Sequence, residues 1–228
     1  MTRLSIIIPA LNESANIRDT LTALAVQREH GVEVIVVDGG SADGTRAVAA
    51  PLCDRVVDSP PGRSAQMNAG CEYSQGDTLL FLHADTRLPQ DADRLILDGL
   101  ARSGRTWGRF DVTIEGRPAM LRVIAWFMNH RSRLTGIATG DQALFVTRDA
   151  FERAGRYANI RLMEDIALCK TLKRTAGPPL CLTARVTTSG RRWEKHGVWR
   201  TIWLMWTLRA RYALGADPDQ LHADYYGR

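Results

Sequence analysis

Blocks of apolar and polar residues alternate along the first 85 positions in a pattern that predicts strands and helices in turn. Apolar, β-branched runs predict buried strands at residues 4–9, 32–38, 54–59 and 77–85. Apolar residues at helical spacing predict helices between them, at residues 13–27, 44–52 and 62–74. Strands that are apolar on both faces and separated by helices are typical of parallel sheets. We therefore predict an α/β fold with a mostly parallel central sheet flanked by helices.

The overall composition is that of one globular unit. A length of 228 residues with 45% hydrophobic content suits one domain with a sizeable core, so we expect residues 1–228 to form a single domain. The four cysteines lack C-x-x-C spacing, which indicates neither a disulfide framework nor a zinc site. The first predicted strand leaves no room for a targeting peptide, and no apolar run approaches the roughly 18 to 20 residues of a membrane span. These features favour the cytoplasm.

Charge is distributed unevenly along the chain. Residues 1–110 hold 11 Arg and 14 Asp plus Glu, whereas residues 111–228 hold 19 Lys plus Arg and 11 Asp plus Glu. A basic second half is compatible with nucleic acid, an anionic membrane surface or a phosphorylated ligand. Because the chain has no tract rich in Lys and Arg and no recognisable nucleic-acid motif, we expect no nucleic-acid partner.

Polar residues follow three of the predicted strands. In open α/β sheets, ligands bind beyond the carboxyl ends of the strands. Asn12, Ser41 and Asp43 are read as residues that cap helices or turn the chain. Asp38 and Asp85 each close a strongly apolar strand, where a carboxylate is costly unless a cation or a hydrogen-bond donor meets it. These two carboxylates are therefore candidate site residues.

Six segments, in order, resemble family 2 glycosyltransferases with the GT-A fold. They are "IIIPALNE", "VIVVDGGSADGT", "GRSAQMNAG", "LLFLHADT", "GDQALF" and "MEDIAL". The resemblance runs from about residue 3 to 195 and is greatest to a small bacterial branch without transmembrane helices, which also carries "SGRRWEKHG" at 189–197. It implies transfer of a sugar from a nucleotide-sugar to an acceptor, with inversion at the anomeric carbon.

The resemblance implies that a UDP-, GDP- or dTDP-sugar is the donor. Asp38 corresponds to the residue that bonds the base or ribose, and the arginines suit the diphosphate because a guanidinium donates two hydrogen bonds at once. The arginines of the list below could instead belong to a solvated basic loop without a ligand. Trp193 could instead be a core or rim residue that does not contact the sugar. The donor contacts that follow are Pro9, Ala10, Glu13, Asp38, Arg63, His83, Ala84, Asp85, Arg191, Arg192 and Trp193.

The resemblance also implies a divalent metal ion. In the family, the final Asp of a D-x-D element binds an ion that bridges the donor phosphates, and Asp85 occupies that position. Mg²⁺ or Mn²⁺ suits this role because a hard cation neutralises charge that develops on the leaving diphosphate. His83 stands where the first Asp is usual, which leaves open whether it ligates metal or contacts the ribose or diphosphate.

A predicted helix over residues 161–174 begins with two carboxylates, Glu164 and Asp165. In the resembled family, the Asp of this pair is the general base that deprotonates the acceptor. Carboxylates at a helix N-terminus are favoured by the helix dipole, so a capping role without catalysis is the alternative. Asp141 of "GDQ" is the reserve candidate for the base and otherwise an acceptor contact.

These assignments divide the chain into a nucleotide-sugar-binding half at 1–110, an acceptor and catalytic half at 111–197 and a C-terminal helical extension at 198–228. We hypothesise an inverting glycosyltransferase. A nucleotidyltransferase is disfavoured because "IIIPALNE" lacks the Gly-rich basic loop expected after the first strand. A non-catalytic nucleotide-binding adaptor would dispense with Asp85 and Asp165, which are both present.

Two segments outside these motifs, at 119–134 and 198–214, are rich in Trp, Met, Leu and Arg at helical spacing. Neither is long or apolar enough to span a bilayer, but either can lie in a membrane interface. The alternative is packing on the sheet or against a second subunit in a homodimer, because burial is the commoner fate of large aromatic residues. A membrane role would place the protein peripherally on the inner face of the cell membrane, with an acceptor that is lipid-linked.

Overall fold

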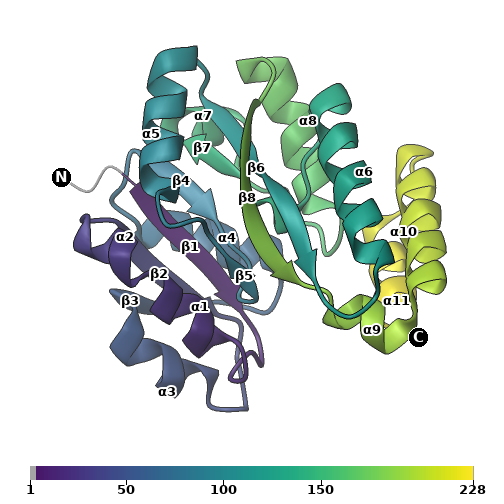
Figure 1. The fold of residues 1–228 in the computed structure, drawn as a ribbon, viewed down its shortest axis with the longest axis horizontal. Coiled ribbons are helices and arrows are strands. Elements are labelled where there is room, and N and C mark those ends of the chain that lie inside the picture. Colours follow the sequence, from purple (N-terminus) through teal and green to yellow (C-terminus); the bar gives the residue numbers. More distant parts are fainter. Residues whose placement is uncertain (1–3, 228) are drawn as a thin grey trace.

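A single curved sheet runs through the protein, which we describe for residues 4–227 of a computed structural model (Figure 1). From one edge of the sheet to the other, the hydrogen-bonded neighbours are β3-β2-β1-β4-β7-β6-β8-β5. Their bounds are β1 (Leu4–Ala10), β2 (Glu33–Asp38), β3 (Arg55–Asp58), β4 (Thr78–Phe81), β5 (Thr86–Arg87), β6 (Trp107–Glu115), β7 (Phe145–Thr147) and β8 (Leu180–Ser189).

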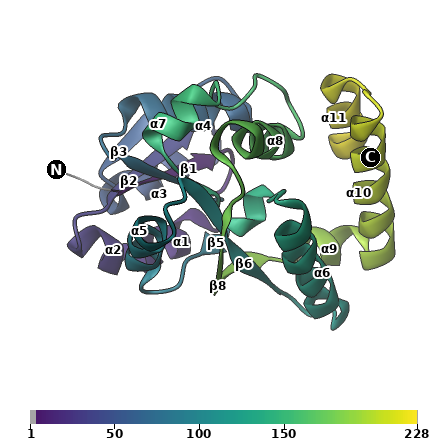
Figure 2. The same ribbon diagram turned by 90° about the horizontal axis from the view of Figure 1, so that it is seen from above.

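Helices cover both faces of this sheet, and the last ones extend beyond one end of it (Figures 1 and 2). The α-helices are α1 (Ile17–Ala23), α2 (Ala25–Glu29), α3 (Thr45–Ala49), α4 (Arg63–Tyr73), α5 (Ala92–Ser103), α6 (Met120–Thr135), α7 (Arg148–Arg153), α8 (Glu164–Ala176), α9 (Arg191–His196), α10 (Val198–Ala213) and α11 (Pro218–Tyr226). Two short 3₁₀ helices, η1 (Ala50–Leu52) and η2 (Gly140–Gln142), complete the set for this part of the chain.

The first half of the sheet is parallel, as the sequence predicts. β1 lies between β2 and β4, and β3 pairs with the outer edge of β2. The second half is mixed, because β7 runs antiparallel to both β4 and β6. β6 and β8 are again parallel, with an irregularity after Phe110. The α/β prediction is thus confirmed, and the antiparallel insertion of β7 is the feature that the apolar pattern did not reveal.

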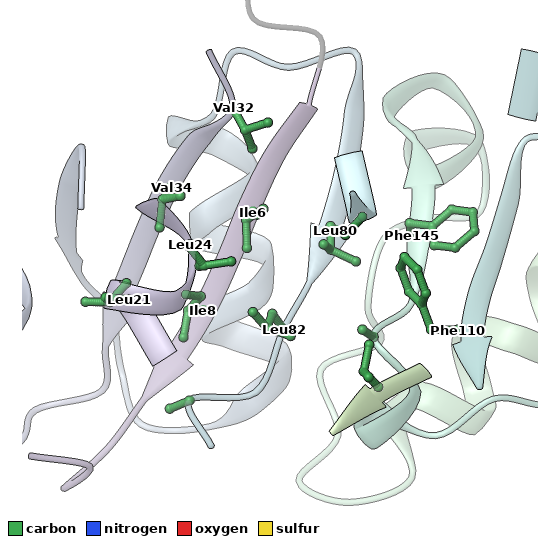
Figure 3. Packing of buried hydrophobic residues seen from close by; sticks show 14 of the residues in the cluster. Ile6, Ile8, Leu21, Leu24, Val32, Val34, Leu80, Leu82, Phe110 and Phe145 are labelled. Carbon is green, nitrogen blue, oxygen red and sulfur yellow. The ribbon is translucent and has the colours of Figure 1, made fainter. Parts of the chain in front are cut away.

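Two apolar layers, one on each face of the sheet, hold the helices in place. Alternate residues of β1 point to opposite layers, so that Ile6 and Ile8 belong to one cluster and Ile7 to the other. Leu21 and Leu24 pack on the first layer beside these strands (Figure 3). Because both faces are covered, the first strands are apolar at nearly every position, which is why they were recognisable in the sequence.

Several predicted elements differ in extent from the structure, as two examples show. The strand predicted at 77–85 ends at Phe81, and the residues from His83 to Asp85 form a turn closed by a hydrogen bond from Thr86 N–H to the His83 carbonyl. The helix predicted at 13–27 is divided at Leu24 into α1 and α2. None of the helices within residues 4–227 combines the length and the apolar character that crossing a bilayer requires.

Candidate active site

The carboxyl ends of β1 and β2 are joined by the side chain of Gln66, a residue of α4. Its amide nitrogen donates to the carbonyl oxygens of Ala10 and Val37, at 2.8 Å each, and the group is buried. The N–H of Gly39 donates to the same Ala10 carbonyl at 2.9 Å. The sequence segment "GRSAQMNAG" contains Gln66 but does not by itself indicate this role. Gln66 fixes the distance between the two strand ends that bear Pro9, Ala10 and Asp38.

Asp38 ends β2 with one carboxylate oxygen engaged and the other without a partner. Oδ2 accepts hydrogen bonds from the N–H groups of Gly40 at 3.2 Å and Ser41 at 3.0 Å. Oδ1 is buried and has no hydrogen-bond partner among the described residues. A buried carboxylate oxygen is costly when left unpaired. The free oxygen is therefore suited to a donor group of a ligand such as a base or a ribose hydroxyl.

Asn12 and Asp43 organise the loops beside these strand ends, as predicted for capping and turn residues. Asn12 Oδ1 accepts from Ala42 N–H at 2.9 Å, and the Asn12 N–H donates to Ser41 Oγ at 2.9 Å. Asp43 accepts from Ser14 N–H at 3.0 Å and from Thr45 N–H at 3.1 Å. The hydrogen bond from Thr45 lowers the pKa of Asp43 against the effect of desolvation.

Asp85 lies in the turn after β4 and faces the guanidinium of Arg191. Arg191 Nη2 is 3.2 Å from Asp85 Oδ2 and 2.7 Å from Glu13 Oε1, so one cation from α9 meets two predicted donor residues. Burial raises the pKa of Asp85, while His83 and Arg191 partly offset this effect. The neighbouring Ala84 is buried, and its carbonyl accepts from Thr20 Oγ1 at 2.7 Å, which fixes the turn.

His83 turns toward Asp141 rather than toward Asp85. Its Nδ1 lies 3.3 Å from Asp141 Oδ1. The ring edge with Nε2 packs so closely on Gly140 that an added Cβ there would overlap it. Burial opposes ionisation of Asp141, but the contact with His83 lowers its pKa overall. With Nδ1 at a carboxylate and Nε2 against backbone, this orientation of His83 does not favour direct metal ligation.

Asp165 stands at the start of α8 and is bonded to the loop that contains Asp141. Its Oδ2 accepts from Gly140 N–H at 3.0 Å, and its Oδ1 accepts from Ile166 N–H at 2.7 Å. The loop itself is held by Gln142, whose amide donates to Ser132 Oγ of α6 at 3.1 Å. "GDQALF" and "MEDIAL", which are separate in the sequence, therefore meet through the hydrogen bond from the Gly140 backbone N–H to the Asp165 carboxylate.

The two carboxylates at the start of α8 have raised pKa values. Burial, followed by repulsion from Asp165, raises the pKa of Glu164 to about 7, and the positive charge of Arg63 opposes the shift. Burial also raises the pKa of Asp165. The helix begins after Met163, which has a φ of 70° and provides no side-chain cap. A carboxylate that titrates near neutrality is suited to accept a proton at physiological pH.

Two arginines introduce positive charge on this side of the site. Arg63, at the start of α4, has a raised pKa because desolvation is outweighed by nearby Tyr226, Glu164, Tyr225 and Asp141. Arg131 of α6 was not identified as a site residue from the sequence, because its segment, 119–134, was interpreted as a helix that meets a membrane, the sheet or a second subunit. Its Nε and Nη2 are buried without hydrogen-bond partners among the described residues, and Asp165 partly offsets the desolvation that lowers its pKa.

Arg192 and Trp193 do not join the carboxylates. Arg192 donates to the Tyr225 carbonyl at 3.1 Å and stacks on the Tyr225 ring, with its guanidinium carbon 3.5 Å from the ring centroid. Trp193 is partly buried against the first apolar layer. Of the adjacent residues in "RRW", only Arg191 thus contacts Asp85. Donor contacts by the other two stay predictions.

The residues around Asp85 are compatible with a hard cation that takes most of its ligands from a substrate. Among residues 4–227, no three His, Cys, Asp or Glu side chains gather to hold a metal on their own. Asp85 nevertheless offers a carboxylate that Arg191 approaches to 3.2 Å, as its one ion pair within residues 4–227. Mg²⁺ is commonly held by one or two carboxylates together with substrate phosphates and water. Asp85 meets that requirement when a diphosphate is bound.

Comparison with known sequences gives consistent results. The model of glycosyl transferase family 2 matches residues 5–156. The probable glycosyltransferase YdaM of Bacillus subtilis (strain 168) is 26% identical over 237 residues, which cover 93% of this chain and 55% of YdaM. Glycosyltransferase AglE of Haloferax volcanii is 38% identical over 90 residues, 36% of this chain and 30% of AglE. The chain thus spans about half or less of the length of these curated relatives.

Solved structures show the same architecture at low sequence identity. S. aureus TarS 1–349 has a TM-score of 0.67 at 17% identity, with 98% of this chain and 70% of TarS covered. Mannosyltransferase PcManGT from Pyrobaculum calidifontis has a TM-score of 0.66 at 18% identity, with 98% of this chain and 68% of PcManGT covered. These similarities confirm the GT-A fold predicted from the six segments.

Proposed function

Because the chain belongs to glycosyl transferase family 2, we propose that it is an inverting, metal-dependent glycosyltransferase that moves a sugar from a nucleotide-diphosphate donor to a hydroxyl acceptor. One observation carries the proposal: a hydrogen bond from Gly140 N–H joins Asp165 to the Asp141 loop, His83 of the turn that contains Asp85 contacts Asp141, and Arg191 contacts Asp85. A proton acceptor and a diphosphate site thus lie in one connected set of residues.

The nucleotide end of the donor would bind at the ends of β1 and β2. The free Oδ1 of Asp38 would accept a hydrogen bond from the base or ribose, beside the backbone of Pro9 and Ala10. Structures of similar fold were solved with UDP-GlcNAc for TarS and with GDP-Man and Mn²⁺ for PcManGT. Those complexes support a nucleotide-sugar donor, and they differ in base and sugar.

The diphosphate would be bound at Asp85, with cationic help from the neighbouring arginines. Asp85 would hold Mg²⁺ or Mn²⁺ together with the phosphate oxygens, and the ion would supply positive charge where the leaving diphosphate becomes more negative. Arg191 already reaches Asp85 and Glu13 from α9, so it needs little movement to donate to a phosphate. Arg63, whose charge acts on Glu164 and Asp141, is a second cation for this role.

Asp165 would accept the proton of the acceptor hydroxyl as that oxygen attacks the anomeric carbon. The bonds from Gly140 and Ile166 hold the two carboxylate oxygens in fixed directions, and burial raises the pKa of the group. Glu164 is the alternative base, because its pKa is raised to about 7. A single displacement of this kind inverts the configuration of the anomeric carbon.

A lipid-linked acceptor is the acceptor class that we favour. An undecaprenyl-phosphate 4-deoxy-4-formamido-L-arabinose transferase of Pseudomonas fluorescens is 30% identical over 154 residues, 60% of this chain and 44% of that protein. The name of that relative supports a polyprenyl lipid as the molecule that carries the acceptor. The enzyme would then act peripherally at the inner face of the cell membrane.

Thermal shift with UDP, GDP and dTDP, each with and without Mn²⁺, tests the donor site. A nucleotide at about 100 times its Kd stabilises the protein by roughly 2.7 kcal/mol, enough to rank the bases. Proton NMR of the transfer product from the preferred donor then reports the anomeric configuration. Nucleotide binding without transfer or hydrolysis of any cognate sugar donor would favour a non-catalytic adaptor, and a product that retains the donor configuration would exclude the single displacement.

A further inference from the structure

The outer face of α10 carries three tryptophans that no other part of the described chain covers. Trp199, Trp203 and Trp206 are 72%, 76% and 74% exposed, respectively. Their spacing of four and three residues places them on one side of the helix. Burial on the sheet, one of the alternatives considered from the sequence, is therefore wrong for these side chains. A row of indoles in water is unusual for a surface without a partner.

A second aromatic group lies on α6. This helix packs on the sheet through residues such as Ile124 and Asn129, while Trp126 and Phe127 are 53% and 60% exposed. The Trp126 ring stacks on His130, with the ring centroids 3.9 Å apart. α6 and α10 lie at the same end of the molecule, opposite β3 and α3 (Figures 1 and 2). Exposed aromatic groups are thus concentrated at one end.

The chain around these tryptophans is basic. Residues 191–214 contain six Lys or Arg and one Glu, and residues 119–135 contain three Arg and no acidic residue. A groove of about 110 Å³ beside α10 is lined by Trp203 together with Arg192, His196, Arg200 and Arg211. Its acidic side chain, Asp224, is paired with Arg211. The groove therefore offers excess positive charge next to an indole.

We propose that the Trp199, Trp203 and Trp206 face of α10, together with this basic groove, binds the surface of an anionic phospholipid bilayer. Indoles prefer the headgroup level of a membrane, where their apolar rings are shielded from water and their N–H groups stay hydrated. The arginines then meet lipid phosphates, with Arg200 at the rim of the groove. The α6 aromatics provide a second contact at the same end of the molecule.

Charge argues against a second copy of the chain as the occupant of this face. In a two-fold dimer the same patch meets itself. The basic residues of this stretch that form neither an ion pair nor a side-chain hydrogen bond within residues 4–227 would then oppose their identical copies, where like charges are unfavourable. They are Lys195, Arg200 and Arg209. An anionic bilayer has the complementary charge. This argument selects the membrane surface over the homodimer that the sequence left open.

The inner face of the same helix packs against the candidate catalytic helix. Leu208 is buried in a cluster with Met163 and Ile166 at the start of α8, and Leu204 and Tyr212 pack against that cluster. At its other end, α10 follows α9 through Gly197, and α9 carries Arg191. Membrane contact would thus hold both Asp165 and Arg191 close to the bilayer. The inference uses the proposed location of the enzyme but not its proposed chemistry.

Co-sedimentation with vesicles tests the surface. The full chain should bind vesicles of phosphatidylglycerol and phosphatidylcholine at low salt, bind pure phosphatidylcholine much more weakly, and dissociate in part at raised salt. Replacing Trp199, Trp203 and Trp206 together by Ser should weaken binding at least tenfold, as should Lys195→Gln combined with Arg200→Gln. Tyr73→Ser, at an exposed aromatic of α4, is the matched control and should bind as wild type.

Tryptophan fluorescence of the wild-type chain gives a second readout that needs no variant. Four of the six tryptophans are in the two exposed groups, whereas Trp107 is fully buried, so insertion should shift the emission to shorter wavelength. Quenching by lipids brominated near the headgroup should exceed quenching by lipids brominated at the chain ends. Wild-type protein that stays in the supernatant at low salt, or emission unchanged by vesicles, would overturn the proposal.

Light scattering tests the alternative that a second copy of the chain covers this face. A wild-type dimer that the triple Trp variant converts to a monomer would assign the face to a second subunit instead of the membrane. Thermal shift with nucleotide and Mn²⁺ should be the same for the triple variant and the wild type, since the three tryptophans neither line the pocket at Asp85 nor bond to Asp38. Loss of vesicle binding with intact nucleotide binding therefore separates this inference from the proposed donor site.

Discussion

Gly140 donates its backbone N–H to Asp165 at 3.0 Å while its Cα packs against the ring of His83. One residue without a side chain thus contacts both the candidate base and the histidine of "HAD". An added methyl group would force the His83 ring away from Asp141, because the space for a Cβ is already occupied.

Gly140→Ala should destabilise the protein by about 1–3 kcal/mol, the usual cost of overpacking. His83→Ala removes the ring that obstructs the methyl group, so Gly140→Ala should cost less in that background. Urea denaturation of the wild type, both single variants and the double variant measures this coupling. Strictly additive free energies of unfolding would mean that the two residues do not obstruct one another.

Asp85→Asn should abolish the metal dependence of nucleoside diphosphate binding and leave the fold intact. The side chain is partly exposed and its polar contact is to Arg191, so the amide is accommodated, but it cannot neutralise a divalent ion. Titration calorimetry with the preferred nucleotide, with and without Mn²⁺, measures the effect. Asp91→Asn, a carboxylate at the start of α5, serves as a control. Metal dependence equal to that of the wild type would move the metal away from Asp85.

Asp165→Asn should preserve donor binding and reduce kcat by a factor on the order of 10² or more, because the proton acceptor is lost.

The same variant distinguishes a hydroxyl acceptor from a phosphate acceptor. A phosphate acceptor has a second pKa near 6 and is ionised at pH 8, so it needs no base. Steady-state kinetics with a hydroxyl and a phosphate acceptor distinguish the cases. Near wild-type rates with the hydroxyl acceptor would transfer the role to Glu164 or Asp141.

Glu164→Gln should stabilise the protein above pH 7 and have little effect near pH 4. Burial raises the pKa of Glu164 from its ordinary value of 4.5 to about 7, so the folded state binds more protons than the unfolded state between these values. The stability of the wild type therefore falls as pH rises from 4.5 to 7, and the neutral amide avoids this loss. Melting temperatures across pH 4 to 8 measure the difference. A Tm difference that does not change with pH would contradict the shift.

The parallel half of the fold was predictable because covered strands are apolar at almost every position. The exact end of β4 was not, since Leu82 continues the apolar run but already lies outside the strand. Pairing of β7 with β4 and β6 depends on contacts more than 35 residues apart in sequence, which local patterns do not encode. Helical spacing predicted that the tryptophans of α10 share one face of a helix. It could not predict whether other residues of the fold would bury that face.

In the candidate site too, residues marked by local patterns were predictable and residues brought in by tertiary packing were not. Strand-end carboxylates such as Asp38 and Asp85 stood out because charge is rare after an apolar run. Arg131 did not, because only tertiary packing brings this residue of α6 near Asp165. The sequence predicts the same role, a contact to the donor, for the adjacent residues Arg191 and Arg192. In the structure their side chains point in different directions from α9, so that Arg191 contacts Asp85 and Arg192 contacts Tyr225.

Gln66 has a consequence for how a nucleotide is received. Its amide holds the ends of β1 and β2 at a set separation through two donated hydrogen bonds, before any ligand arrives. Asp38 is thereby held at a strand end that is already positioned, so ordering of the strand ends adds little entropic cost to binding. Since both bonds are donations, the isosteric Glu cannot replace them. Gln66 would thus preorganise the site for the base without contacting the base itself.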